Sequence, residues 1–225
     1  MPRHLAFSVI LLALGFMNSA SADVIYNVVV NSSSIMGVAG SLDFNFNPGP
    51  LTTTPASLQI FNFVSDGSLT DCTANIQGFC ATGDVIGQLS EIVTFDNGAG
   101  LNDYFDDFTF GSELSFSVRL YGTALSAQGG GATSGSLFAL SIFSDTAGTT
   151  PVLTSDTADG FAMTIAINPD GSLTADNFST ETSLTSESVE TSEPRDLSLL
   201  GILAITAKLF LIKREGRMST LSLRK

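Results

Sequence analysis

Hydrophobic and polar residues alternate along most of the chain between residues 23 and 178. The clearest case is LSFSVRLY, residues 114–121, in which four apolar residues alternate with Ser, Ser, Arg and Tyr. Successive side chains of a β-strand point to opposite faces, so this period of two predicts a strand with one buried face. The same pattern recurs in SLDFNF and FAMTIAI, and we expect further strands at 24–30, 58–64, 85–95 and 137–143, with weaker ones near Phe108 and Leu173.

Turn signals separate these segments. They are NPGP, SDGS, DNGAG, QGGG and NPDGS, and each combines a residue that tolerates positive φ with one that interrupts strand pairing. About eight or nine short strands at this spacing, with no helical pattern between them, predict two antiparallel sheets packed face to face. The expected fold is therefore an all-β, jelly-roll-like β-sandwich that occupies residues 23–178 as one domain.

The segment 179–191 differs from the strands before it. Its sequence STETSLTSESVET is rich in hydroxyl side chains and Glu, and only Leu184 and Val189 are core formers. A segment that buries so little apolar surface does not offset the entropy of ordering it. We therefore predict a disordered linker here.

The N-terminus predicts export. Residues 1–22, MPRHLAFSVILLALGFMNSASA, have a basic start, an apolar run and a small-residue Ala-Ser-Ala ending. These three parts in this order are typical of a secretory signal peptide, which we expect to be cleaved before Asp23. Cleavage removes His4, the one histidine of the chain.

The two cysteines, Cys72 and Cys80, predict a disulfide. An exported protein folds in an oxidising compartment, where a pair at this spacing closes a small loop. A zinc site would need further Cys or His ligands, and the mature chain has none.

A second apolar segment, 197–212, lies near the C-terminus and precedes the basic residues Lys213, Arg214 and Arg217. As a helix it would be about 24 Å long, and Lys208 near its end can extend toward the headgroups. We predict a transmembrane helix whose basic tail lies on the cytoplasmic side. The alternative is an amphipathic helix packed on the body.

These C-terminal residues resemble a known sorting signal. Ser192-Glu193-Pro194, an apolar helix and then Lys213-Arg214 are similar to the PEP-CTERM signal of Gram-negative bacteria, with Ser192 in place of the first proline. The resemblance implies a signal at 192–217, followed by an extension at 218–225. It also implies recognition by an exosortase-type processing enzyme and a place at the cell surface. The alternative is a retained membrane anchor.

The body resembles one group of PEP-CTERM proteins, whose activity is unassigned. The similar pieces are GSLDFNFNPGP (40–50), GDVIGQL (83–89), LNDYFDDFTFG (101–111) and SGSLFALSIF (134–143). The family association implies a role in the envelope or the exopolysaccharide matrix, with polysaccharide as a candidate partner.

The charge of the chain excludes one class of partner. The formal net charge is −13, and residues 23–194 contain 20 acidic residues but Arg119 as their one basic residue. Such a surface repels phosphate backbones, so we exclude nucleic acid as a partner.

We identify no catalytic residue in the sequence. A serine or cysteine nucleophile needs a base, usually His, and the mature chain has none. Two carboxylates can hydrolyse a glycoside, so a carboxylate-dependent glycoside hydrolase is the enzymatic alternative. The absence of Trp and the three Tyr residues leave few sugar platforms, and we expect a non-enzymatic protein.

One polar cluster suits a metal ion. DNGAGLNDYFDD gathers oxygen ligands in a Gly-containing segment, and Ca²⁺ prefers such ligands. The candidate ligands are Asp96, Asn102, Asp103, Asp106 and Asp107. The alternatives are a calcium-dependent adhesin, if the site is real, and a solvated turn with capping side chains, if it is not.

Overall fold

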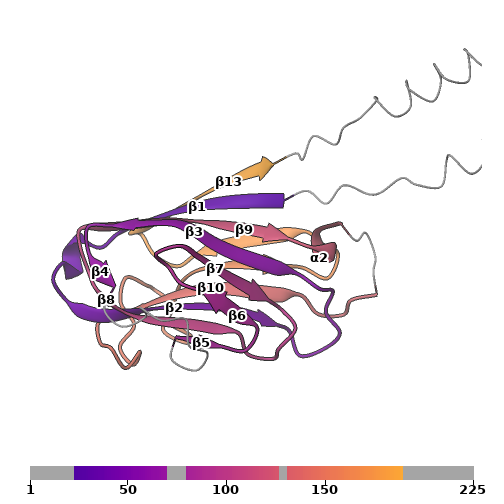
Figure 1. Ribbon diagram of the computed structural model, residues 1–225, viewed down its shortest axis with the longest axis horizontal. Helices are drawn as coiled ribbons and strands as arrows, with labels where there is room; N and C mark the ends of the chain where they lie inside the picture. The colour runs from indigo at the N-terminus through magenta and orange to yellow at the C-terminus, as the bar shows by residue number, and fades with distance from the viewer. Residues whose placement is uncertain (1–22, 70–79, 127–130, 190–225) are drawn as a thin grey trace, which may run out of the picture. The chain divides into compact units, whose positions relative to one another are not determined.

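The computed structural model describes residues 23–69, 80–126 and 131–189. Its elements, labelled as in Figure 1, are β1 (Asp23–Asn31), η1 (Ser33–Ile35), β2 (Ala39–Pro48), β3 (Ser57–Ser65), β4 (Ser68–Leu69), β5 (Ala81–Thr82), β6 (Val85–Gly87), β7 (Ile92–Asp96), β8 (Asp103–Thr109), β9 (Glu113–Tyr121), α2 (Thr123–Ser126), β10 (Ser136–Phe143), β11 (Phe161–Ile167), β12 (Leu173–Asn177) and β13 (Thr182–Val189).

The strands form two antiparallel sheets, which confirms the predicted all-β class and fits a sandwich. One sheet has six strands in the order β13-β1-β9-β3-β7-β6. The other has seven strands, with the order β12-β11-β10-β2-β8-β4 and with β5 also paired to β8. Every recorded strand pair is antiparallel. The chain changes sheet repeatedly, and two of these crossings, from β1 to β2 and from β12 to β13, lie close together at one end of the β1–β13 pair.

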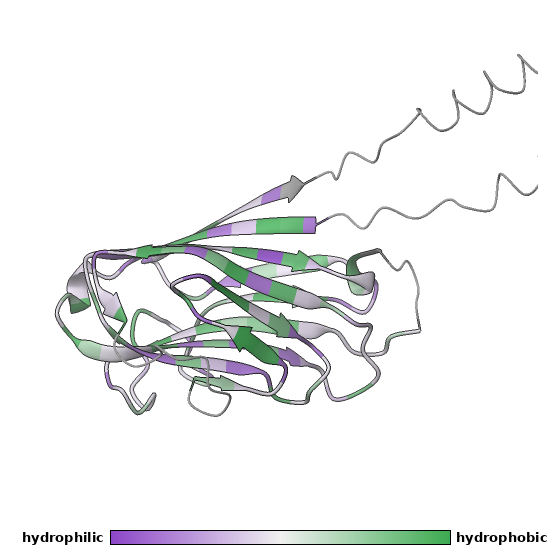
Figure 2. Ribbon diagram, viewed as in Figure 1, coloured by the Kyte–Doolittle hydropathy of each residue, from purple (hydrophilic) through white to green (hydrophobic). Residues whose placement is uncertain are grey.

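The alternating pattern explains which side of each strand is buried. In β2 the side chains of Leu42, Phe44 and Phe46 are fully buried, whereas Asp43 and Asn45 lie on the outer face. Figure 2 shows this alternation as bands of hydrophobic and hydrophilic colour along the strands. The inner faces of the two sheets meet directly. The ring of Phe44 from one sheet packs edge to face on the ring of Phe116 from the other, with 5.4 Å between the ring centroids. The core therefore lies between the two sheets.

The structure corrects two predictions, one of a strand and one of a linker. The range 85–95 forms two strands, β6 and β7, because a tight turn interrupts it: Gly87 has φ +104°, and the Gln88 N–H donates to the Ile92 carbonyl at 3.2 Å. The linker predicted at 179–191 is wrong for residues 182–189, which form β13 along the edge of the first sheet. Pairing with β1 supplies the stabilisation that this segment lacks by itself, so the sandwich extends beyond residue 178.

The predicted signal peptide (1–22) and sorting signal (192–217) lie outside the described residues, as does the extension 218–225. The transmembrane helix predicted at 197–212 is therefore untested. Within the described ranges, no helix has the length and apolar character needed to cross a bilayer.

Candidate functional site

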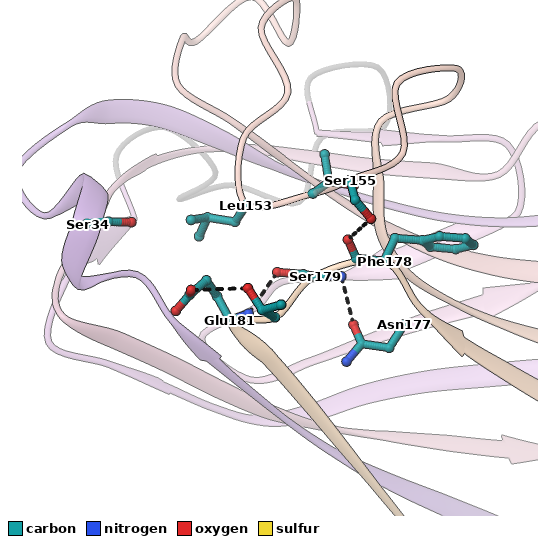
Figure 3. Close-up of a pocket in the computed structure, with 9 residues that line it drawn as sticks. Ser34, Leu153, Ser155, Asn177, Phe178, Ser179 and Glu181 are labelled. Atoms are coloured by element: carbon teal, nitrogen blue, oxygen red, sulfur yellow. Dashed lines mark hydrogen bonds between the residues drawn. The ribbon is translucent and has the colours of Figure 1, made fainter.

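A hollow in the described surface lies at the end of the sandwich where β1 leads to β2 and β12 leads to β13. Its volume is about 470 Å³, and we call it the distal groove. Three segments line it: η1 between β1 and β2, the loop between β10 and β11, and the turn between β12 and β13 (Figure 3). The lining residues are Ser34, Leu153, Thr154, Ser155, Asn177, Phe178, Ser179, Thr180 and Glu181.

Side-chain hydrogen bonds hold the β12–β13 turn in place. The Asn177 amide donates to the Thr182 carbonyl at 2.6 Å, and its oxygen accepts from the Ser179 N–H at 3.1 Å. The Ser179 hydroxyl in turn accepts from the Glu181 N–H at 3.2 Å, and the Glu181 carbonyl accepts from the Asn31 N–H at 2.8 Å. Asn and Ser bond readily to nearby backbone, which is why this short segment turns here. The turn therefore sets the position of Glu181.

The β10–β11 loop is joined to the same turn. Both the N–H and the hydroxyl of Ser155 donate to the Phe178 carbonyl at 2.7 Å. Beside it, Leu153 has φ +54°, a left-handed conformation that is costly for a branched side chain. Strained backbone persists only where its surroundings hold it, and it gathers at binding sites. A strained apolar residue in the wall of a groove therefore marks this loop as a candidate functional element.

The groove is polar and acidic. Its lining has hydroxyl side chains on all three segments and one ionisable group, Glu181, and none of the lining residues is cationic. Within the described ranges the recorded ion pair joins Arg119 to Asp23 on the first sheet, so it does not neutralise Glu181. The groove is thus suited to a ligand that is not anionic.

The predicted calcium ligands do not converge on one point. Strand β8 buries alternate residues, so Asp106 is on its inner face, whereas Asp103 and Asp107 are on its outer face. Among the described residues, no group of three or more His, Cys, Asp or Glu side chains is placed to hold a metal ion. Calcium therefore remains a prediction of the sequence, and this geometry lends it no support.

The other two candidate ligands have structural partners. Asp96 ends β7 and accepts a hydrogen bond from the Ser57 hydroxyl of the neighbouring β3. Asn102 is fully buried: its amide donates to the carbonyls of Phe46 and Ala99, both at 3.0 Å, and its oxygen accepts from the Asp84 N–H at 2.8 Å. Asn102 therefore fastens three backbone segments together.

Asp106 belongs to a polar network inside the core. The Tyr104 hydroxyl accepts from the Leu89 N–H at 3.2 Å and donates to the Asp106 carboxylate at 3.3 Å. Burial, together with the nearby Asp106 charge, raises the pKa of Tyr104 well above its usual range. The tyrosine is therefore a fixed hydrogen-bond donor at any ordinary pH.

Sequence reasoning missed a pair of carboxyl groups on the outer face of the second sheet. Asp43 of β2 and Asp103 of β8 lie diagonally across this strand pair, because the register opposes Asn45 to Asp103. Burial, followed by the hydrogen bond and charge of Asp103, raises the pKa of Asp43 to about 8. Asp43 is thus protonated at neutral pH and donates to Asp103. The alternating pattern of each segment places its Asp on the outer face, but only the pairing register brings Asp43 and Asp103 together.

The remaining predicted site residues are not described by the structure. Cys72 and the motif residues Ser192, Glu193, Pro194, Lys213, Arg214 and Arg217 lie outside the described ranges. Cys80 lies next to β5, and no described cysteine is free. Because Cys72 is not described, the Cys72–Cys80 disulfide stays a prediction.

Sequence reasoning also missed the distal groove. Its residues come from three segments far apart in the chain, and Ser, Thr and Asn are common in turns that bind nothing. The isolated residues therefore carried no signal of a site.

Comparisons of this chain with protein-family models, with curated proteins and with solved structures find no match.

Proposed function

We propose that this is an exported, non-enzymatic β-sandwich protein that is sorted to the bacterial cell surface and acts there as an envelope or exopolysaccharide-matrix component. The proposed export and surface sorting rest on the sequence. It has a signal peptide at 1–22 and a PEP-CTERM-like segment at 192–217 that an exosortase-type enzyme recognises. The sandwich is the part that is displayed.

One structural observation supports this proposal most strongly. The first residue of β1, Asp23, pairs with the last residue of β13, Val189, so the described chain begins and ends at one end of the sandwich. At the other end of the same strand pair, Val30 faces Thr182, next to η1 and the groove-lining turn. Figure 1 shows β1 and β13 running side by side away from the end of the body where β4 lies.

This arrangement suits a protein held by its C-terminal tail. The chain leads from Val189 directly to the proposed sorting signal. Seven steps of strand, roughly 23 Å, separate Val189 from Thr182. The groove-lining turn is therefore about 23 Å along the strand from Val189, the last described residue before the proposed sorting signal.

The lining of the groove supports a binding role over catalysis. Glu181 is the one carboxylate among the residues that line the groove, whereas a glycoside hydrolase needs two carboxylates. The groove is thus better suited to recognition than to acid–base chemistry.

Labelling at the cell surface tests the proposal. A Ser34→Cys variant in the cells that produce the protein is treated with a membrane-impermeant maleimide, and the intact mass of the recovered chain is measured. We expect the variant to be labelled equally in intact and in lysed cells, and the mass to show loss of residues 1–22. The unsubstituted chain, whose cysteines are expected to be oxidised, measures the background.

Two results would contradict the proposal. One is a variant that is labelled only after lysis. The other is a full-length chain, with its N-terminal 22 residues retained, recovered from the cytosol.

A further inference from the structure

Three of the five hydroxyls that line the distal groove already donate their protons within the protein. The hydroxyl of Ser155 donates to the Phe178 carbonyl at 2.7 Å, and that of Thr154 donates to the Phe161 carbonyl. The Thr180 hydroxyl donates to the Glu181 carboxylate at 3.3 Å. With their protons used in this way, these hydroxyls keep only lone pairs for a ligand. The groove therefore favours a ligand rich in donors.

Glu181 adds a negative charge to this wall. Its carboxylate has no cationic partner in the described part of the chain, where the recorded ion pair is Arg119 with Asp23. Residues 23–194 carry 20 acidic residues against one basic residue, so the field around the body attracts cations and repels anions. A protonated amine meets both conditions, because it is positively charged and has only donors.

The size and the apolar part of the groove point to more than a bare ammonium ion. At about 470 Å³, the groove is in the range that holds a small organic ligand. Figure 3 shows Leu153 on the same side of the groove as Ser34 and Glu181, whereas the ring of Phe178 points away from them. Leu153 thus gives an apolar contact beside the polar groups, which suits the C–H face of a sugar ring whose hydroxyls and amine reach the acceptors.

From these observations we propose that the distal groove binds an amino-sugar unit, whose protonated amine is held by the Glu181 carboxylate and whose ring lies against Leu153. This inference names a class of ligand for the groove. Its biological role rests on the proposed function, which places the groove at the cell surface. Binding by the isolated chain is a separate result, so a failure of sorting and a failure of ligand recognition are distinguishable.

Calorimetric titration of the chain isolated from its producing cells tests the inference. The probes are a glucosamine trisaccharide, its fully N-acetylated form, which is neutral, and trilysine, which carries amines without a sugar. We expect the glucosamine trisaccharide to bind about tenfold more tightly than either other probe, because charge-assisted hydrogen bonds are roughly twice as strong as neutral ones.

Variants locate the binding. Glu181→Gln keeps the shape of the side chain and removes its charge, and we expect it to weaken glucosamine binding by about tenfold. The matched control is Glu187→Gln, which makes the same change at an exposed position on β13 away from the groove. It should change the affinity by less than about twofold, because exposed charges contribute little.

Several outcomes would overturn the inference. Equal affinity for the N-acetylated trisaccharide would remove the role of the amine, and equal affinity for trilysine would remove the role of the sugar. Equal losses in Glu181→Gln and Glu187→Gln would mean that the net charge of the body attracts the probe without a site. Absence of glucosamine binding to a folded chain would reject the site altogether.

Discussion

Single polar side chains inside the sandwich connect segments that the strands leave apart. Asn102 is the clearest example, because it lies between β7 and β8 and is fully buried. Its three side-chain hydrogen bonds reach the backbone of Phe46, Ala99 and Asp84. The sequence placed this residue among candidate calcium ligands, since oxygen-rich loops have the same composition in both roles. Its burial and its partners indicate a structural role.

We predict that Asn102→Ala lowers the free energy of unfolding by about 3 kcal/mol, because it removes three hydrogen bonds at about 1 kcal/mol each and leaves buried backbone groups unpaired. Urea denaturation measures the change. The control is Asn168→Ala, whose side-chain bonds to Ser172 and Thr174 are exposed, and which should cost less than about 1 kcal/mol. Equal effects of the two variants would refute the structural role of Asn102.

At the scale of elements, the pairing of β2 with β8 creates a property that neither strand has alone. The register brings Asp43 close to Asp103 on the outer face, where burial and the neighbouring carboxylate raise the pKa of Asp43 to about 8. The folded state therefore holds a proton that the unfolded chain releases near pH 4. This protonation stabilises the strand pair fully below the unfolded pKa, and the stabilisation is lost as the pH rises through about 8.

The free energy of unfolding should thus fall between pH 4 and pH 8, by a contribution on the order of a few kcal/mol from this group. An Asp43→Asn variant has no proton to lose at this position, so we expect a flatter dependence and greater stability than the unsubstituted chain at pH 8. Thermal denaturation across this pH range measures both. Asp176→Asn, an exposed change on the same sheet, should leave the slope as it is. A slope that Asp43→Asn does not alter would contradict the shared proton.

At the scale of the whole molecule, the two ends of the described chain are parts of one sheet. Strand β13 covers β1 on the side opposite β9, so β1 has a partner on both sides. Leu184 of β13 also packs against the core. This closure gives the body a single end where the chain enters and leaves, and it leaves the distal groove at the other end.

We predict that a chain of residues 23–189 is more stable than a chain of residues 23–178 by at least about 2 kcal/mol, because the shorter one loses the backbone pairs of β13 and the burial of Leu184. Denaturant unfolding of the two chains measures the difference. A chain ending at residue 194 serves as the control and should match the 23–189 chain. If residues 179–189 were a linker, all three stabilities would agree.

The sequence alone determined the local features of this protein. Period-two alternation located most of the strands and their buried faces, because burial of one face of a strand needs only a hydrophobic residue at every second position. The acidic balance and the segments at both ends are equally local, and from them come the expected exclusion of nucleic acid and the expected export. Only the tertiary structure decided which strands pair, and in which register. β13 became a strand through its contact with β1, Asp43 met Asp103 across β2 and β8, and three distant turns formed the groove. Each of these features depends on contacts between residues far apart in the chain. The free energy of such contacts cannot be read from the sequence of a single segment.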